Sequence, residues 1–375
     1  MKLFKKKKAP SVTAEIVSAD RMHSGGFTLP QSVEPFEKEL YDRLRFAVPV
    51  IDAAIMKVIR LTGGFHVVCS DEKMQDELDS FLENVPVGLS GRSVGYFADS
   101  FLDSLLTYGS AVGEIALDTA ENRIAGLRCG DVSSIRVAEG ETPFTRSYKI
   151  RSDDGTLRSV RHPERILYSS LIGGHSVLRG LPSLSSILLR IFECIGQNFD
   201  RAGNVRYAVT YKPPKDDFIY SKERAQQIAR EWADGMNSAK YGQVKDFVAV
   251  GDVDIKVIGA ENQLFDTNVP VRQLLEQILA KLSIPPFLLG LNWTTTERMS
   301  SQQADILTSE LEYYRRLLTP VIREIGDAYL CSVGSDASCT VEWDNINLQD
   351  EESLADARLK NAQAREIELR LENNN

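Results

Sequence analysis

The tripeptide Gly174-His175-Ser176 comes nearest, in this chain, to a known catalytic pattern. In the turn G-x-S-x-G, the backbone between a strand and a helix exposes a serine hydroxyl as a nucleophile. Here Leu178 stands where the last glycine belongs, and no clean strand leads directly into the serine. A serine hydrolase built on Ser176 therefore remains only an alternative, and we expect that the chain is not an enzyme.

Metal-binding and redox patterns are also sparse. Asp252 and Asp254 alternate on one face of an expected strand and could offer carboxylate oxygens to a cation, but such alternation is also typical of a solvated strand. The four histidines share no ligand spacing, and the five cysteines form no C-x-x-C pair. The sequence contains no G-x-x-x-x-G-K-[ST] or G-x-G-x-x-G loop. We predict no metal, no cofactor and buried free thiols, and any motor activity would need another chain.

The composition is that of an ordinary globular protein: 375 residues, 43% apolar and 26% charged. The net charge is −9, yet five lysines fall within Met1–Lys8, so the remaining chain is more acidic still, at −14. Such a body is a poor general phosphate binder, because phosphate contacts need clustered Lys and Arg. The lysines are followed by no apolar signal segment, and no run of about 18 apolar residues predicts a membrane span.

The N-terminal half is predicted to be mixed α and β. Residues 1–33 are expected to be a flexible arm. Apolar positions from Phe36 to Leu61 fit one face of a helix that Pro49 would bend, and a second helix is expected from Arg92 to Tyr108, ending at Gly109. From Ala111 to Val160 the apolar period changes to two, with turn residues between short runs, which predicts an antiparallel meander.

The C-terminal half is predicted to contain three longer helices around a small α+β module. One helix ends at Gly203, and a strand, a helix and a strand pair follow it, the helix with Ala225, Ile228, Ala229 and Trp232 facing inward. The next helix begins with Asn268 as its N-cap. The last long helix is expected to open with a capping box at Ser300 and to kink at Pro320, with buried positions Ala304, Leu307, Leu311, Tyr314, Leu318, Val321 and Ile325. A strand over 339–346 and a charged tail, either helical or disordered, follow.

A stiff corner and a polar loop separate the last two helices. Pro285 and Pro286 are expected to end the first of them in an extended corner. Phe287, Leu288 and Leu289 would anchor this corner in the core, and Gly290 would release the chain. The loop that follows lacks apolar periodicity and consists of Asn292, Trp293, Thr294, Thr295, Thr296, Glu297 and Arg298. Alternatively, 287–299 is a surface connector with Trp293 packed on the core.

Five pieces of sequence, in this order, resemble the portal proteins of tailed bacteriophages. They are "LLTYGSAVGEI", "RHPERILY", "LRGLPSLSSI", "LAKLSIPPFLLG" and "SSQQ" ahead of a long helix with an internal proline. In that family an RG turn precedes the first stem helix, and a double proline leads from the second stem helix into a loop. The resemblance extends from Phe36 to Trp343.

The resemblance implies a portal-type α+β subunit in a homo-oligomeric ring, commonly of twelve copies, at one capsid vertex. Double-stranded DNA would pass through the channel during packaging and ejection. The ring would dock the terminase packaging motor and head-completion or tail proteins, and would contact capsid and scaffold proteins. It would be assembled in the host cytoplasm and reside in the virion, without contact to a membrane.

The resemblance also implies a division of the chain into parts. These would be an N-terminal arm (1–33), a wing (34–181), a first stem helix (182–202), a clip (203–262), a second stem helix (263–284), a tunnel loop (285–300), a long kinked helix with a wing strand (301–345) and a short crown or disordered tail (346–375). Within the tunnel loop, Asn292–Arg298 would face the DNA. The short sequence after Trp343 leaves the size of the crown open.

The physics of a DNA channel agrees with this reading. Each phosphate neutralised by Lys or Arg adds affinity that must be broken again as DNA moves, so a channel should be acidic or neutral. The stretch Leu291–Met299 has one Glu and one Arg, and its threonine hydroxyls can contact phosphate or sugar without a fixed charge. The remaining alternative is a monomeric adaptor or scaffold protein of the same particle.

Overall fold

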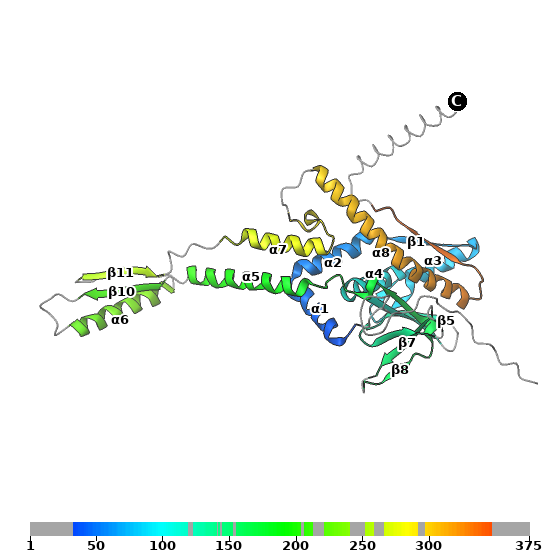
Figure 1. The fold of residues 1–375 in the computed structure, drawn as a ribbon, viewed down its shortest axis with the longest axis horizontal. Coiled ribbons are helices and arrows are strands. Elements are labelled where there is room, and N and C mark those ends of the chain that lie inside the picture. The colour runs from blue at the N-terminus through cyan, green and yellow to red at the C-terminus, as the bar shows by residue number, and fades with distance from the viewer. Residues whose placement is uncertain are drawn as a thin grey trace, which may run out of the picture. The chain divides into compact units, whose positions relative to one another are not determined.

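The computed structural model describes residues 33–118, 123–140, 142, 145–152, 155–203, 206–212, 221–240, 252–258, 266–291 and 297–346 (Figure 1). The chain divides into two compact units, Met1–Ser185 together with Gln273–Asn375, and Ser186–Arg272. Both units mix helices and strands. Apart from Val33 and Ile346, the predicted arm and tail lie outside the described residues; Val33 is buried, so the prediction of a flexible arm is wrong at that residue. None of the helices in the described part of the chain is long and apolar enough to cross a bilayer.

The first unit begins with two helices, α1 (Pro35–Ala47) and α2 (Pro49–Thr62). The prediction of one bent helix is wrong, because Val48 leaves helical space with φ −123° and ψ 87°. A residue before proline is pushed out of the α region, and Pro49 then starts a new helix at a position where its missing N–H is not needed. Arg45 joins the two helices through hydrogen bonds of its Nε and Nη2 to Asp52 Oδ1, at 2.8 and 2.6 Å.

Helix α4 forms the centre of this unit. The chain reaches it through strand β1 (Phe65–Cys69), the 3₁₀ turn η1 (Glu72–Met74), helix α3 (Gln75–Asn84) and the short strands β2 (Pro86–Val87) and β3 (Gly91–Arg92). Helix α4 (Val94–Tyr108) ends at Gly109, as predicted. Apolar side chains recur along it at helical spacing and are fully buried: Phe97, Phe101, Leu102, Leu105 and Leu106.

Two sheets follow α4. The five-stranded sheet has the order β3-β2-β5-β4-β9 and adds β4 (Ser110–Asp118), β5 (Arg123–Cys129) and β9 (Ile166–Ser170), the last after the turn η2 (Pro163–Arg165). The three-stranded sheet contains β6 (Ile135–Glu139), β7 (Arg146–Arg151) and β8 (Leu157–Ser159).

The prediction of one antiparallel meander is therefore only partly confirmed. Consecutive strands do pair antiparallel, but they fall into two separate sheets, and β2 pairs with β5 in parallel. A strand of two residues has no readable alternation, and its choice of partner depends on contacts far along the chain. The sequence pattern could therefore not show this pairing.

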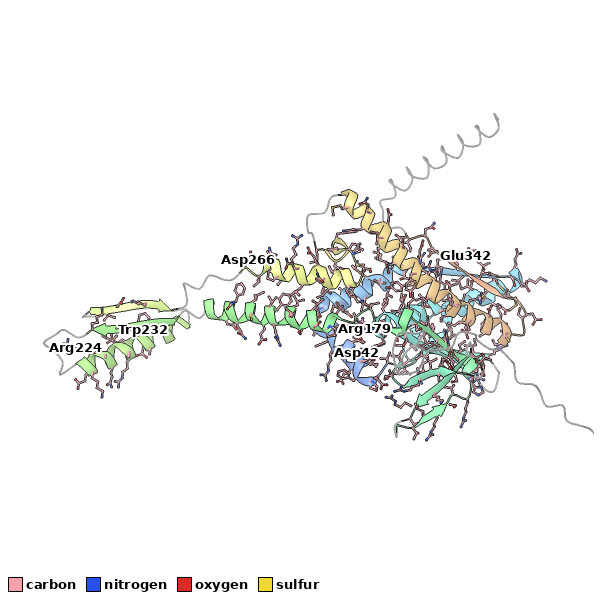
Figure 2. All side chains as sticks on the ribbon, in the orientation of Figure 1. Asp42, Arg179, Arg224, Trp232, Asp266 and Glu342 are labelled. Carbon is pink, nitrogen blue, oxygen red and sulfur yellow. The ribbon has the colours of Figure 1, made fainter. Side chains whose placement is uncertain are left out.

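The second unit contains most of α5 (Leu181–Gly203), then β10 (Arg206–Lys212), α6 (Ser221–Lys240) and β11 (Asp252–Ile258). Strands β10 and β11 pair antiparallel over their whole length, which agrees with the predicted module. The predicted inward face of α6 is wrong in part: Ala225 and Ala229 are exposed, whereas Ile228 and Trp232 are half-buried. Trp232 is labelled on this helix in Figure 2. The first strand of the predicted pair, 245–251, lies outside the described residues.

Helix α7 (Asn268–Lys281) and the long helix α8 (Glu297–Ser332) follow, and strand β12 (Cys339–Trp343) pairs antiparallel with β1. The predicted cap at Asn268 is wrong by one residue: Asn268 is the first residue of the helix, and the Thr267 carbonyl before it accepts the first helical hydrogen bond, from the Val271 N–H at 3.1 Å. Asp266 Oδ1 accepts from the Asn268 N–H at 3.0 Å. The predicted inner face of α8 is confirmed, since all seven positions named for it are buried.

The cysteines differ from the prediction of buried thiols. Cys69 and Cys339 are buried and Cys129 is half-buried, whereas Cys194 and Cys331 are exposed; all five are free. Burial raises the pKa of the Cys129 thiol to about 12. Burial, together with the neighbouring Asp327, does the same for Cys339, so neither thiol is a reactive thiolate at neutral pH.

Gly109 provides a stability test of this core. It ends α4 with φ 84°, and a Cβ at this position would lie 2.3 Å from the backbone carbonyl carbon of His175. Left-handed strain and this backbone clash together are expected to lower the free energy of unfolding of Gly109→Ala by about 3 kcal/mol. The control is Gly95→Ala in the same helix, whose Cβ meets nothing nearer than 3.6 Å. Urea unfolding of both variants measures the difference, and equal stabilities would contradict the prediction.

Candidate functional site

The corner after α7 begins with a left-handed serine. Ser283 has φ 54°, and the Ile284 N–H donates to the Leu279 carbonyl at 3.1 Å, which is a Schellman-type helix end. Ile284 and Pro285 are both buried. The prediction that the two prolines end the helix is wrong, because the helix stops at Lys281, four residues before the first proline.

The double proline then forms a 3₁₀ turn, η4 (Pro286–Leu289), in place of the predicted extended corner. Pro285 is extended, with φ −62° and ψ 133°, as a residue before proline should be. The fixed φ of Pro286 also fits a 3₁₀ turn, and its missing N–H costs nothing at the first position. Gly290 ends the turn with φ 76°, and its N–H donates to the Phe287 carbonyl at 3.0 Å.

Turn η4 lies against α2. Pro285 is buried, while Phe287, Leu288 and Leu289 are each half-buried. Leu288 and Leu289 line a groove with residues of α1 and α2, namely Asp42, Arg45, Phe46, Pro49, Asp52, Ala53, Met56, Lys57 and Arg60. Phe46 at its edge is 91% exposed. The corner is thus a compact turn packed on α2 within the first unit, beside a groove lined by both charged and apolar residues.

The predicted DNA-facing residues are only partly described. Asn292–Thr296 lie outside the described residues. Glu297 and Arg298 belong to the first turn of α8, so their assignment to a loop is wrong, and so is the capping box at Ser300. The helix begins three residues earlier because Glu297, Arg298 and Met299 are acceptable helix formers and nothing before Ser300 forbids helical φ and ψ.

Pro320 lies on the exposed side of α8, and the helix continues through it to Ser332. Proline removes the hydrogen bond that its own N–H would donate four residues back, which bends a helix without necessarily ending it. The Thr319 hydroxyl beside it donates to the Arg315 carbonyl at 2.8 Å. The kink at Pro320 stays a prediction.

Arg315 is a buried link that the sequence analysis missed. Its side chain leaves α8 and donates from Nε to the Thr62 carbonyl at 2.8 Å and from Nη1 to the Asp344 carbonyl at 2.7 Å. The guanidinium carbon lies 5.0 Å from the centre of the Trp343 ring. One side chain therefore ties α8 to the end of α2 and to the segment after β12. The sequence feature that could have indicated this link is the position of Arg315 next to Tyr314, on the apolar face of the predicted helix.

Neither Ser176 nor the pair Asp252 and Asp254 is arranged as a catalytic or metal-binding site in the described structure. Ser176 is buried, its hydroxyl donates to the Thr107 carbonyl at 2.6 Å, and it accepts from the Leu178 N–H at 2.9 Å. This hydroxyl fixes the loop after β9 to the end of α4, so it is not presented as a nucleophile. Asp254 lies 3.7 Å from Lys256 Nζ. Across the described part of the chain, His, Cys, Asp and Glu gather nowhere in a group of three that could hold a metal.

Comparison with solved structures matches nearly the whole chain, although no protein-family model and no curated protein match the sequence. A chain of the virion of the native gene transfer agent (GTA) particle has a TM-score of 0.61 at 15% identity, over 91% of both chains. A chain of the neck of the native GTA particle, computed with C12 symmetry, has a TM-score of 0.61 at 14% identity, over 88% of this chain and 89% of that chain.

A weaker likeness is to an HK97 family phage portal protein from Corynebacterium diphtheriae, with a TM-score of 0.41 and 12% identity over 83% of this chain and 95% of that one. Identities this low bear on the fold alone. The chain therefore has the fold of a chain in the neck of the native GTA particle.

Proposed function

We propose that this chain is a portal protein. Copies of it, twelve by the family resemblance, would form a ring at one vertex of the capsid of a tailed phage or related particle, and double-stranded DNA would enter and leave through the channel. The observation that supports this most is the likeness in fold to a chain of a particle neck computed with C12 symmetry. Such rings arise when one head-to-tail interface is repeated by rotation until it closes.

The charge of the chain supports a channel through which DNA slides. The chain carries −9 in total, and the part after Lys8 carries −14, because its acidic residues outnumber its Lys and Arg. A ring of such subunits has an acidic net charge, so DNA would not be held strongly at each step. Residues 292–296 lie in sequence between the 3₁₀ turn η4 and the first residue of α8. We propose that residues 292–296 contact the passing DNA.

The remaining roles follow the resemblance. Residues 203–262 are proposed to dock the head-completion adaptor and the terminase motor, and the wing is proposed to contact capsid and scaffold proteins. In this role the protein is part of the virion and performs no catalysis of its own. The buried, hydrogen-bonded hydroxyl of Ser176 supports this assignment over a serine hydrolase.

The number of copies in the native assembly tests the proposal. We expect a closed ring with a native mass of twelve times 41.8 kDa, about 500 kDa, either from the purified chain or after extraction from particles. Native mass spectrometry and rotational averaging of electron micrographs measure the copy number. One or two copies in intact particles would contradict a ring and would favour the alternative of a monomeric adaptor.

A further inference from the structure

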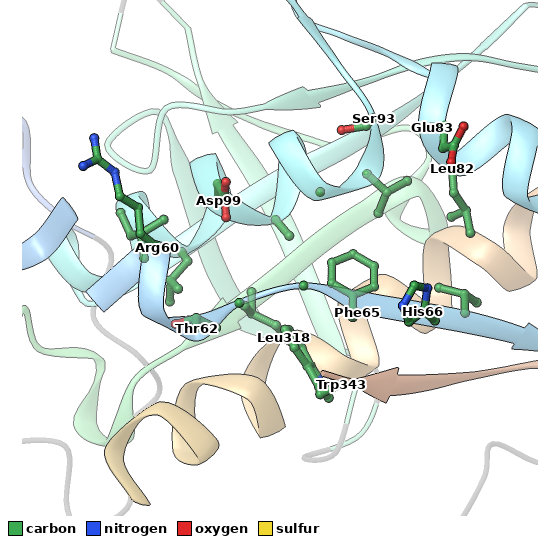
Figure 3. A pocket seen from close by; sticks show the side chains of 18 of the residues that line it. Arg60, Thr62, Phe65, His66, Leu82, Glu83, Ser93, Asp99, Leu318 and Trp343 are labelled. Carbon is green, nitrogen blue, oxygen red and sulfur yellow. The ribbon is translucent and has the colours of Figure 1, made fainter. Parts of the chain in front are cut away.

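A groove of about 700 Å³ lies between strand β1 and the N-terminal half of α4 (Figure 3). It belongs entirely to the first unit and is distinct from the corner at η4. Apolar side chains from α2, β1, α3, α4, α8 and β12 line it: Ile59, Phe65, Val67, Leu82, Val94, Ala98, Leu102, Leu318 and Trp343. The Phe65 ring points into this space (Figure 3).

One side of the groove is the open edge of β1. Two hydrogen bonds at the ends of the pairing show which backbone groups of β1 face β12. The Asp344 N–H donates to the Gly64 carbonyl at 3.0 Å, and the Ser70 N–H donates to the Ser338 carbonyl at 2.9 Å, so the even-numbered residues face β12. In an antiparallel pair such bonds recur at every second residue. The backbone groups of the odd-numbered residues of β1 must therefore point away from β12, toward the opposite edge.

A side chain already occupies part of this edge. Gln75 accepts from the Cys69 N–H at 2.8 Å and donates to the Val67 carbonyl at 2.9 Å, as a neighbouring strand would do. Within the described residues, no partner is found for the Val67 N–H or for the N–H and carbonyl of Phe65. An open edge with unpaired groups beside an apolar groove is a template for another strand.

The charges around the groove differ at its two ends. Glu83 on α3 lies at the end of the groove next to His66 (Figure 3). Asp79, one helical turn earlier, also lines the groove. Arg60 lies at the other end, where α2 leads into β1, with Asp99 on α4 facing it across the groove (Figure 3). A strand bound here would meet two carboxylates, Asp79 and Glu83, at the α3 end of the groove near His66, and a guanidinium together with a carboxylate, Arg60 and Asp99, at the other end.

We propose that the N-terminal segment of this chain, Ser11–Val17 with the preceding Lys5–Lys8, binds in this groove as an antiparallel strand on the open edge of β1. The segment reads Ser-Val-Thr-Ala-Glu-Ile-Val, in which Val12, Ala14 and Ile16 alternate with more polar residues. Such alternation, rich in β-branched residues, suits a strand with one apolar face.

The charges of the segment match the groove in the antiparallel direction. The four lysines would lie beside Asp79 and Glu83, and Glu15, seven residues after Lys8, would lie toward Arg60. A parallel strand would instead place the lysines at the end of Arg60 and Asp99, whose charges offset each other, and would place Glu15 beside Asp79 and Glu83, where like charges repel. The polarity of the groove thus selects one direction.

The connection is long enough to allow this binding. The described chain resumes at Val33, which is buried in a cluster with Val112, Val132 and Ile135. The 16 residues from Val17 to Val33 span at most about 55 Å when extended. That length crosses a folded body of this size, whose radius of gyration is expected to be roughly 20 Å. The segment can therefore reach the groove of its own subunit or that of an adjacent copy.

Amide hydrogen exchange of Val67 in the full-length chain tests the proposal. Because the Val67 N–H would donate to the added strand, its exchange is expected to be at least about tenfold slower in the full-length chain than after deletion of residues 1–20. A peptide of residues 3–19, added to the truncated chain, is expected to restore the slow exchange. Equal exchange in the full-length and truncated chains would overturn the proposal, because the edge would then be open in both or covered by something else.

Charge reversal distinguishes this groove from a non-specific basic contact. In the full-length chain, Glu83→Lys is expected to speed Val67 exchange, whereas Glu77→Lys on the same helix, which does not line the groove, is expected to leave it unchanged. Combining Glu83→Lys with replacement of Lys5–Lys8 by glutamate is expected to restore protection. Equal effects of the two α3 variants, or no recovery in the combined variant, would contradict binding in this groove and direction.

Discussion

Deletion of Thr294–Thr296 is expected to leave the ring intact and to abolish the stable packaging of DNA. On the proposed function, these residues reach the DNA from between two fixed points, the turn η4 and the first turn of α8. The hydrogen bonds that close the corner are made before this segment: the Gly290 N–H donates to the Phe287 carbonyl and the Leu291 N–H to the Pro286 carbonyl. Folding and assembly should therefore persist while the contact with DNA is lost.

Three measurements separate these effects. Native mass reports ring assembly, thermal unfolding reports the fold, and nuclease-protected DNA in purified particles reports packaging. A variant with Ser-Gly-Ser in place of Thr294–Thr296 keeps the loop length and is expected to package DNA, which separates the reach of the loop from the identity of its side chains. If the deletion prevents ring formation, or if DNA content is unchanged, the segment is a structural connector.

Replacement of Arg315 by leucine is expected to lower the free energy of unfolding by about 3 to 4 kcal/mol, because hydrogen bonds from a charged donor contribute about 1.5 to 3 kcal/mol each and two carbonyls lose their partner. The lost donors are Nε to Thr62 and Nη1 to Asp344. The stacking of the guanidinium on Trp343 disappears as well. Denaturant unfolding of the purified chain measures the change.

Two variants serve as controls for Arg315. Arg316→Leu alters the next residue, which is exposed, and is expected to change stability by no more than about 0.5 kcal/mol. Arg315→Lys keeps the charge but not the planar fork that reaches two carbonyls, so an intermediate loss is expected. Equal stability of the Arg315 and Arg316 leucine variants would show that the link between α8, α2 and the segment after β12 contributes little.

The helices and their ends were predictable where the controlling residues are neighbours in sequence. The spacing of apolar residues in α8 identified its buried face, and Gly109 identified the end of α4. Errors occurred where two local preferences compete. Pro49 allowed either a bend or a new helix, and Ser283 adopted a left-handed conformation for which its type gives no strong signal.

The types of elements, their order and the family resemblance could be predicted from the chain alone, because periodicity, proline and glycine act on the backbone within a few residues. Which elements contact each other depends on the folded protein. Arg315 and Thr62 are 253 residues apart, and strand β1 pairs with β12 from the other end of the chain. The pairing leaves one edge of β1 open beside an apolar groove, and no local pattern encodes that edge, because it depends on which strand, helix and side chain arrive from elsewhere in the fold.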